Sequence, residues 1–256
     1  MALTAHLQDA YEKQYQDSQS EWRELGARQK VQNMVEVTGG KRFGKVLEVG
    51  AGDGSLLQLL NAQGVADELY ALEISGSALE RIHARNIPKL KEAKCFDGYS
   101  IPYEDNYFDL VVLSHVLEHV EFERKLLREI KRVSRYQVVE VPKDYRFGID
   151  KRVKHFLSYG HINVYTPSSF CFLLRSEGFR ILKKKVGLYS KATYQYMGCS
   201  SSGKYQPSFG KVLKANLLYM VKWLFVSAPS TRIRDHFANT ITVMVEPEEV
   251  TVNIFK

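Results

Sequence analysis

Residues 46–55, VLEVGAGDGS, decide how this chain folds. A short apolar run from Lys45 to Val49 ends in a turn with three glycines, and residues 55–60 (SLLQLL) then place apolar side chains at helical spacing. Strand, tight turn and helix in this order are typical of the unit that opens a parallel α/β sheet. Glycines in such a turn let backbone N–H groups approach a ligand beyond the carboxyl end of the strand, so we predict a ligand site here.

The same alternation of strands and helices continues along the chain. We expect further strands at residues 68–74, 93–96, 108–113, 136–141, 179–188 and 239–245. We expect further helices at residues 77–85, 116–133 and 166–178. Strands separated by helices indicate a doubly wound sheet with helices on both faces. The predicted fold class is therefore α/β, with a mostly parallel, seven-stranded, Rossmann-like sheet.

The pattern divides the chain into an N-terminal helical cap, residues 1–38, and one larger domain, residues 39–256. The cap carries an aromatic stripe on one helix face, formed by Tyr11, Tyr15, Trp22 and Leu25. In the larger domain a long irregular loop at residues 142–166 follows a strand end, which is where functional loops occur. A helical insertion at residues 200–237 precedes the last strand.

The insertion contains one long helix, residues 211–226, that is apolar around most of its circumference. Its lysines, Lys211, Lys214 and Lys222, fall within about 80° of one another on a helical wheel. Such a helix either packs against the domain as a buried cover or lies on an apolar surface such as a membrane. A membrane-surface helix usually has a broader charged face, so we predict the buried cover.

Composition and charge exclude several classes of protein. The chain has 256 residues, 45% of them apolar and 25% charged, as in ordinary globular proteins. Its net charge of +7 gathers in runs such as residues 151–154 and 183–185, which we interpret as solvated faces before anion-binding ones. The cysteines Cys95, Cys171 and Cys199 have neither disulfide nor zinc spacing. With no signal-peptide pattern and no apolar stretch of membrane-spanning length, we expect a cytoplasmic protein without a transmembrane segment.

Carboxylates follow three consecutive predicted strands. Glu48 stands two residues before the first glycine of the turn, where an acid would repel a pyrophosphate but attract an ammonium group. The third glycine also comes one position too early for a dinucleotide fingerprint, which disfavours an NAD-dependent oxidoreductase. Glu73 is placed to accept ribose hydroxyls, and Asp97 with Gly98 to receive the exocyclic amine of an adenine. Each acid alone is an ordinary strand-end residue, but three together indicate a nucleoside ligand with an amino-acid part.

Four segments resemble the motifs of class I S-adenosylmethionine-dependent methyltransferases: LEVGAGDG, YALEIS, CFDGYSIPYEDNYFDLVVLSHVLEHV and YQVVEVP. The resemblance covers residues 39–142, and IPYEDNYFDLV is similar to the subgroup that methylates small molecules. It implies S-adenosyl-L-methionine as the cofactor and assigns a role to each strand end. The implied contacts are Gly50 and Gly52 with the methionine part, Glu73 with the ribose, Asp97 and Gly98 with the adenine, Ser114 with the methionine end and Glu48 with the ammonium group.

Outside these motifs, Arg28 is a further candidate for the cofactor carboxylate. The alternative, a surface charge on the N-terminal helix, is favoured.

Catalysis of methyl transfer needs little acid–base chemistry, because the sulfonium group is already activated and the enzyme chiefly aligns the reactants. A base helps when the acceptor is a hydroxyl or a protonated amine. Histidine suits this role near neutral pH. The candidates are His115, His119, His155 and His161, and we predict His119 and His161 as the catalytic residues. His161 lies in GHINVYTP, which resembles a segment that closes over the active site in this subgroup; a histidine that only packs the loop is the alternative.

His115, Glu118 and His119 stand at i, i+3 and i+4, which would place them on one face of the expected helix. The formal match to an H-x-x-E-H zinc protease is rejected, because the motif begins at a strand end of a cofactor-binding sheet. The trio also resembles the Glu-x-x-Glu-His metal site of ubiquinone-pathway O-methyltransferases and of small-RNA terminal methyltransferases. Here His115 replaces the first Glu, which would shift the preference from magnesium towards softer metals. A base, a metal ligand and a structural residue stay open for His119, and we predict no bound metal.

The predicted function is in-line transfer of a methyl group to an oxygen or nitrogen of a small-molecule acceptor, with oxygen ahead of nitrogen. The N-terminal helix, the loop 144–165 and the helix 211–226 would cover an aromatic, lipid-like or anionic acceptor. One alternative is RNA methylation, which the basic charge favours and the lack of a stacking-aromatic RNA module disfavours. Another is a non-catalytic protein that binds S-adenosylmethionine. The sequence does not determine the acceptor or the oligomeric state.

Overall fold

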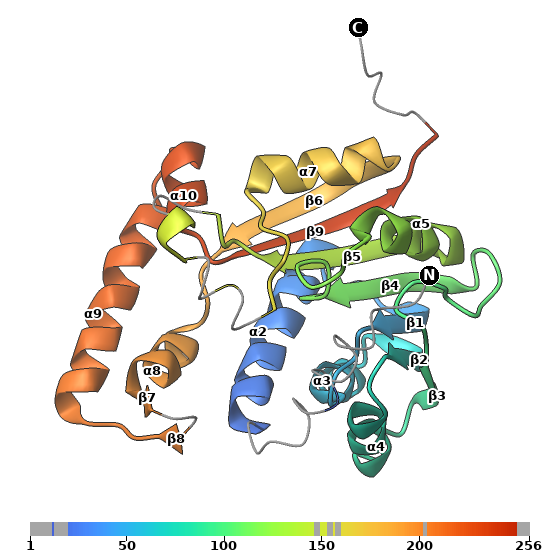
Figure 1. Ribbon diagram of the computed structural model, residues 1–256, viewed down its shortest axis with the longest axis horizontal. Coiled ribbons are helices and arrows are strands. Elements are labelled where there is room, and N and C mark those ends of the chain that lie inside the picture. The colour runs from blue at the N-terminus through green and yellow to red at the C-terminus, as the bar shows by residue number, and fades with distance from the viewer. Residues whose placement is uncertain are drawn as a thin grey trace, which may run out of the picture.

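The computed structural model describes residue 12 and residues 20–145, 149–152, 156, 160–201 and 204–249. A seven-stranded sheet of order β3-β2-β1-β4-β5-β9-β6 forms its centre, as Figure 1 shows. The strands are β1 (Phe43–Val49), β2 (Ala66–Glu73), β3 (Leu90–Cys95), β4 (Phe108–Ser114), β5 (Ser134–Pro142), β6 (Phe179–Gly187) and β9 (Thr240–Pro247). The pairings among β1 to β5 are parallel, and β9 runs antiparallel to both β5 and β6. The predicted mostly parallel seven-stranded sheet is confirmed.

Helices cover both faces of this sheet. The helices of the described residues are α2 (Ser20–Thr38), α3 (Ser55–Ala62), α4 (Gly76–Ala84), α5 (Glu123–Val133), α7 (Pro167–Ser176), α8 (Lys191–Cys199), α9 (Phe209–Val226) and α10 (Thr231–Phe237), with the short 3₁₀ helix η1 (Ile149–Arg152). A two-stranded hairpin, β7 (Ser200–Ser201) and β8 (Lys204–Tyr205), lies between α8 and α9.

The alternation of side chains along the strands explains the two layers. Val46 and Leu47 are neighbours on β1, and both are fully buried, but they point to opposite faces of the sheet. Val46 belongs to the core formed with α2, α3 and α4, which includes Leu57. Leu47 belongs to the core formed with α5 and α7, which includes Leu127. A strand that is apolar on both faces must be covered on both, and this makes the sheet doubly wound.

The helix expected at residues 116–133 is shorter than predicted. α5 begins only at Glu123, and the preceding residues form turns. His115 has a positive φ of 59°, which a helix does not allow. The side-chain amide of Asn163 donates to the carbonyl oxygens of Leu117 (3.0 Å) and Val120 (2.7 Å), which a helix would use for its own hydrogen bonds.

The insertion before the last strand also differs from the prediction. It begins directly after β6, earlier than the predicted residue 200, and contains α8, which the sequence did not reveal, as well as α9 and α10. The expected buried cover is wrong for α9, because Ala215 is the only buried residue of this helix. α9 packs on α8 and α10 along one side and lies at the outer edge of the molecule in Figure 1. In the described part of the chain, no helix combines the length and the apolar character needed to cross a membrane.

The N-terminal aromatic stripe is seen in part. Trp22 on α2 stacks on Tyr196 of α8, with ring centroids 5.6 Å apart. Tyr11 and Tyr15 lie outside the described residues.

Two leucine substitutions compare a buried position with an exposed one. Leu57→Ala should lower the free energy of unfolding by about 2–5 kcal/mol, because it leaves a cavity between α3 and the sheet. Leu217→Ala on α9 makes the same chemical change at an exposed position and should alter stability by about 0.5 kcal/mol or less. Urea denaturation of both variants measures the difference, and equal losses would contradict the burial described here.

Candidate functional site

The loop between β1 and α3 turns sharply at the carboxyl end of β1. Gly50, Gly52 and Gly54 have positive φ angles of 72°, 56° and 77°. A Cβ atom at Gly50 would lie 2.5 Å from Cγ2 of Val116, which belongs to the turn after β4. Any side chain at position 50 would therefore push the two loops apart. The glycine keeps the backbone of β1 in direct contact with the turn that follows β4.

A salt bridge fixes the other end of this loop. Arg85 donates to the carbonyl oxygen of Asp53 (2.5 Å) and forms an ion pair with its Oδ2 (3.0 Å). The Oδ1 of Asp53 accepts hydrogen bonds from the backbone N–H and the hydroxyl of Ser55. Asp53 thus stabilises the start of α3.

Glu73 ends β2 and joins it to the glycine loop. Its carboxylate accepts hydrogen bonds from the backbone N–H groups of Gly52 (2.7 Å), Ile74 (2.8 Å) and Ser75 (3.2 Å). A carboxylate offers about four lone-pair sites, so three of them are occupied by the backbone. Burial raises the pKa of Glu73, although these three donors oppose the shift. The N–H of Gly52 points to Glu73 and not to the outside of the loop.

Glu12, which was not predicted from the sequence, reaches the same strand end. Its carboxylate accepts hydrogen bonds from the N–H groups of Gly76 (2.6 Å) and Ser77 (3.1 Å) and from the hydroxyl of Ser75 (3.1 Å). Glu12 thereby caps the N-terminus of α4, where a negative charge is stabilised. No sequence signal marks it, because it is one of many polar residues in the N-terminal segment.

Asp97 follows β3 and is exposed. Its Oδ1 accepts hydrogen bonds from the N–H groups of Tyr99 (2.8 Å) and Ser100 (2.6 Å). Partial burial opposes ionisation, but these donors lower the pKa of Asp97 below its usual value. The neighbouring Gly98 is buried. Asp97 is therefore a charged carboxylate in a fixed turn at the end of the third strand.

Glu48 is a buried acid on β1, and its carboxyl group is not fully hydrogen-bonded. Its Oε2 has no hydrogen-bond partner within the described residues. Burial raises the pKa of Glu48 to about 8, although the positive charge of Lys30 opposes the shift. Lys30 extends from α2 to the carbonyl oxygen of Ser114, 3.3 Å away, at the end of β4. Arg28, the residue considered from the sequence, lies on the exposed side of α2, which favours its interpretation as a surface charge.

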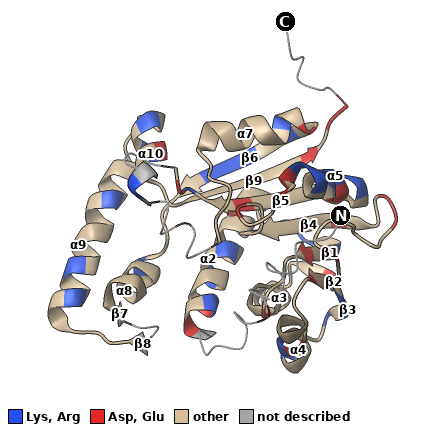
Figure 2. Cartoon of the chain, viewed as in Figure 1, with Lys and Arg blue, Asp and Glu red and all other residues tan. Residues whose placement is uncertain are grey.

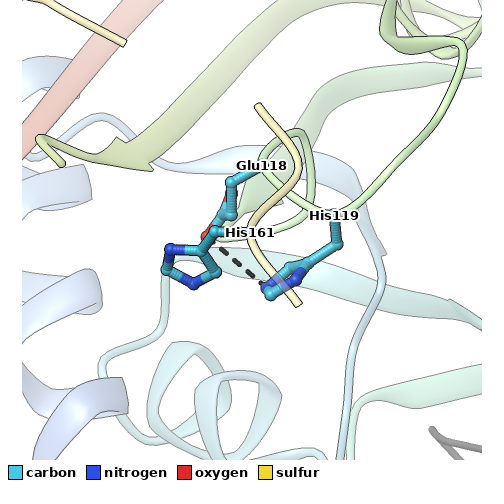
Figure 3. A group of neighbouring side chains, drawn as sticks. All are labelled: Glu118, His119 and His161. Atoms are coloured by element: carbon cyan, nitrogen blue, oxygen red, sulfur yellow. Dashed lines mark ion pairs between the residues drawn. The ribbon is translucent and has the colours of Figure 1, made fainter. Parts of the chain in front are cut away.

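Glu118, His119 and His161 form a cluster, and Figure 3 shows their side chains close to one another. Glu118 and His119 come from the turn after β4, and His161 comes from the segment after η1. The backbone N–H groups of Ile162 (2.8 Å) and Asn163 (3.1 Å) donate to the carbonyl oxygen of Glu118, which holds the two segments together. The rings of His119 and His161 meet edge to face, with centroids 4.8 Å apart.

His119 and His161 differ in protonation because their Nδ1 atoms have different hydrogen-bond partners. Nδ1 of His119 lies 3.0 Å from the carbonyl oxygen of Gly160, which can only accept, so Nδ1 carries the proton and Nε2 is the basic atom. Burial lowers the pKa of His119, which keeps the ring neutral near pH 7. Nδ1 of His161 lies 2.5 Å from Oδ2 of Asp144. Burial opposes protonation of His161, but this hydrogen bond prevails and raises its pKa.

The donor atoms of Glu118, His119 and His161 all lie within 4.8 Å of one another. Both carboxylate oxygens of Glu118 are buried without a hydrogen bond from the described residues. Its Oε1 lies 3.5 Å from Nδ1 of His115 and 3.7 Å from Nε2 of His119. Two imidazoles and a carboxylate form a set that suits zinc or another divalent transition metal. The site fits a metal, and the prediction of no metal remains a prediction.

The acids and glycines at the ends of β1 to β3 and the cluster of Glu118, His119 and His161 lie along one edge of the sheet. The strand order is that of a doubly wound fold, and comparison of the sequence with known families identifies which one. Residues 19–184 match a family model described as a methyltransferase domain, which is well over half of the chain. The chain belongs to the class I S-adenosylmethionine-dependent methyltransferases.

Two curated relatives are similar in sequence to part of this methyltransferase. A malonyl-acyl-carrier-protein O-methyltransferase from Halorhodospira halophila is 32% identical over 92 residues, which are 35% of this chain and 31% of the relative. A ubiquinone/menaquinone biosynthesis C-methyltransferase from Burkholderia mallei is 30% identical over 95 residues, which are 36% of this chain and 39% of the relative. The matched stretches span about a third of these relatives, so their acceptors do not transfer directly.

Solved structures show the same fold. A Haloferax volcanii protein described as a putative methyltransferase, in complex with the activator Trm112, has a TM-score of 0.62 at 13% identity and covers 93% of this chain and 98% of its own. Phosphoethanolamine N-methyltransferase 2 of Haemonchus contortus, solved with S-adenosyl-L-methionine, has a TM-score of 0.59 at 14% identity and covers 87% and 53%. At 13–14% identity, these likenesses show that the chain shares the fold of these proteins.

The methyltransferase fold brings most of the sequence-predicted residues to one edge of the sheet. Those at or after the carboxyl ends of β1 to β4 are Glu48, Gly50, Gly52, Glu73, Asp97, Gly98 and Ser114. His119 and His161 lie side by side next to this row. His115 does not share a helix face with His119, as the sequence suggested, because that helix starts later. His155 lies outside the described residues.

Glu140, which was not among the residues predicted from the sequence, lies next to the candidate site and joins several elements. It is buried on β5, and its carboxylate accepts hydrogen bonds from Asn33 of α2 (2.8 Å) and from the hydroxyl of Thr242 on β9. Nε2 of His115 lies 3.2 Å away. Burial opposes ionisation, but these partners hold the pKa of Glu140 below its usual value. An acid inside the apolar run YQVVEVP was the available signal.

Replacing Glu48 tests its burial. Between pH 4.5 and about 8 Glu48 keeps a proton in the folded protein that it has lost in the unfolded chain, so the contribution of Glu48 to stability falls as the pH rises through this range. Glu48→Gln should therefore raise the free energy of unfolding of the ligand-free protein by up to about 3 kcal/mol at pH 7, and by little near pH 4.5. Chemical denaturation across this pH range measures the gain. Glu21→Gln on the exposed side of α2 is the control, and a gain that does not depend on pH would contradict the assignment.

Proposed function

We propose that this methyltransferase binds S-adenosyl-L-methionine along the ends of β1 to β4 and transfers its methyl group to an oxygen or nitrogen of a small-molecule acceptor held beside His119 and His161. Oxygen is favoured. The observation that carries this proposal is the partly buried His119, whose Nε2 is its basic atom and whose lowered pKa keeps it neutral near pH 7. A neutral histidine suits the removal of a proton from a hydroxyl, which a sulfonium electrophile alone does not achieve.

The described contacts support a place for each part of the cofactor. The unpartnered Oε2 of Glu48 would accept from the ammonium group, and the ammonium of Lys30 would pair with the cofactor carboxylate beside Ser114. Glu73 has one lone-pair site left after its three backbone donors, which allows one direct ribose hydroxyl. Oδ2 of Asp97 would accept from the adenine amine, because its Oδ1 is held by the turn.

The chain's own residues would act mainly by orientation. The rigid glycine loop and Glu73 would fix the sulfonium, so that the acceptor atom, methyl carbon and sulfur lie in line. His119 would take the acceptor proton on Nε2 while its Nδ1–H stays bonded to Gly160. His161, held by Asp144, would donate a hydrogen bond to the acceptor. The proton of the acceptor would then be removed at the same partly buried site where the acceptor is aligned with the methyl group.

A metal-assisted variant of this function has its own support. Glu118, His119 and His161 would hold a divalent ion, and the uncompensated Glu118 carboxylate favours it. Such an ion supplies Lewis-acid polarisation of an acceptor oxygen when bound. In this variant His119 and His161 orient the acceptor as ligands, and neither removes a proton.

Calorimetric titration tests the cofactor site. Wild-type protein should bind S-adenosylmethionine and S-adenosylhomocysteine and should not bind NADH. Glu73→Ala should abolish binding, because it releases the glycine loop as well as the ribose contact. Asp97→Asn keeps the Oδ1 that holds the turn and should weaken binding about tenfold through the lost charged acceptor. The control Asp67→Asn removes a charge from an exposed ion pair and should leave affinity unchanged.

A folded protein free of co-purified ligand that binds neither sulfur compound would overturn the proposed cofactor site.

Histidine titration by NMR separates the base from the metal ligand. The side-chain signals should show His119 titrating below pH 6.5 and His161 above it, and Asp144→Asn should shift the His161 midpoint downward. One equivalent of zinc sulfate should leave both titrations unchanged if His119 is the base. Tight stoichiometric zinc binding that removes both titrations, and that Glu118→Gln prevents, would replace the base with the metal-assisted variant. Signals are assigned with His119→Gln and His161→Gln.

A further inference from the structure

The outward side of α9 is a continuous apolar surface. At its centre are the exposed side chains of Phe209, Leu213, Leu217, Met220, Val221 and Leu224, and the exposed Leu218, Trp223 and Phe225 flank them. At 100° per residue the central side chains occupy one side of the helix. The opposite side packs inward, where Ala215 is buried and Tyr219 contacts Tyr194 of α8. Large contiguous apolar surfaces on soluble folds mark sites of binding to another apolar surface.

Charge around this surface is strongly one-sided. The segment 191–237 contains seven Lys and Arg residues and one acid, Asp235, so it carries +6 of the net charge of +7. Lys211 and Lys214 are exposed at one border of the apolar surface, and Lys222 lies over the ring of Tyr194. In Figure 2, α9 shows blue segments and no red. The complementary partner is therefore both apolar and negatively charged.

Two occupants compete for this surface, and charge decides between them. A second copy of the chain packed on the same surface would bring lysines of two α9 helices together without an acid of α9 to pair with them. A membrane surface with anionic lipids matches both features, since acyl chains take the apolar side and headgroups take the lysines. We propose that α9 lies in the interface of an anionic lipid membrane.

The position of α9 connects this surface to the methyltransferase site. The insertion leaves the sheet at Gly187 and returns at Thr240, and these residues are register partners. Thr240 also pairs with Pro142, the last residue of β5. The insertion therefore emerges at the carboxyl ends of the parallel strands, which is the edge that carries the cofactor and histidine clusters. Membrane attachment would hold this edge near the lipid, and the attachment itself does not depend on the proposed transfer reaction.

Vesicle co-sedimentation of the full chain tests the proposal. Binding is expected to vesicles with about 30% phosphatidylglycerol in phosphatidylcholine, to be at least tenfold weaker for phosphatidylcholine alone, and to fall as salt rises from about 0.05 to 0.5 M. Lys211→Gln/Lys214→Gln should weaken binding to the anionic vesicles at least tenfold, from about fivefold for each lysine. The control Lys41→Gln/Lys91→Gln removes the same charge from exposed positions away from the insertion and should bind as the wild type does.

Insertion of the apolar side is tested separately. Leu217→Glu/Leu224→Glu should abolish vesicle binding, and it should keep its melting temperature and its affinity for S-adenosylmethionine because both side chains are exposed. The chain has two tryptophans, so vesicles should shift the emission of Trp223 to shorter wavelength in Trp22→Phe and produce no shift in Trp223→Phe.

Two results would overturn the proposal. One is the absence of binding to anionic vesicles by a folded, monomeric wild type. The other is a wild-type dimer in analytical ultracentrifugation that Leu217→Glu/Leu224→Glu converts to monomer without any effect of vesicles, which would assign the surface to a second copy.

Discussion

The burial of one carboxylate, Glu140, sets the arrangement of the segments around the site. A charge without water is tolerated only when hydrogen bonds replace its hydration. Asn33, Thr242 and His115 supply those partners from three different segments of the chain. Satisfying Glu140 therefore fixes α2 and β9 against β5 and holds His115 at the end of β4. The turn that carries Glu118 and His119 begins at that histidine.

The other buried acids differ in how fully the protein compensates them, and this difference marks the ligand site. Glu73 receives three backbone N–H groups and so belongs to the framework. Glu48 and Glu118 each have carboxylate oxygens without a hydrogen bond from the described residues. An uncompensated buried carboxylate costs stability in the ligand-free protein. A cationic ligand at Glu48, and a cation at Glu118, would recover that cost on binding, so part of the binding free energy comes from these two carboxylates.

The insertion differs from the rest of the molecule in the direction that its apolar side chains face. Across the sheet, apolar side chains face inward from both layers. On α9 they face outward, with lysines at the border. Helix periodicity alone does not distinguish a helix covered by its own domain from one covered by a partner, because the same apolar side chains suit both. The excess of positive charge in this segment favours the partner with anionic headgroups.

The sequence by itself determined the parts of the protein that depend on neighbouring residues. The strand, glycine turn and helix at residues 43–62, the order of the strands along the chain and the row of acids at their ends follow from local periodicity and turn chemistry. The family resemblance was already visible in these motifs and is confirmed.

Only the tertiary structure decided what depends on contacts between distant segments. Asn163 occupies the carbonyls of Leu117 and Val120 and so delays the start of α5, which no local pattern around residue 116 reveals. The same packing brings His161 beside His119 and sets their opposite pKa shifts, while Glu12 and Glu140 take up roles through partners far away in sequence. The exposure of α9 belongs here too. The hydrogen bonds, burial and protonation of a residue depend on its neighbours in space, and those neighbours are brought together only when the whole chain is folded.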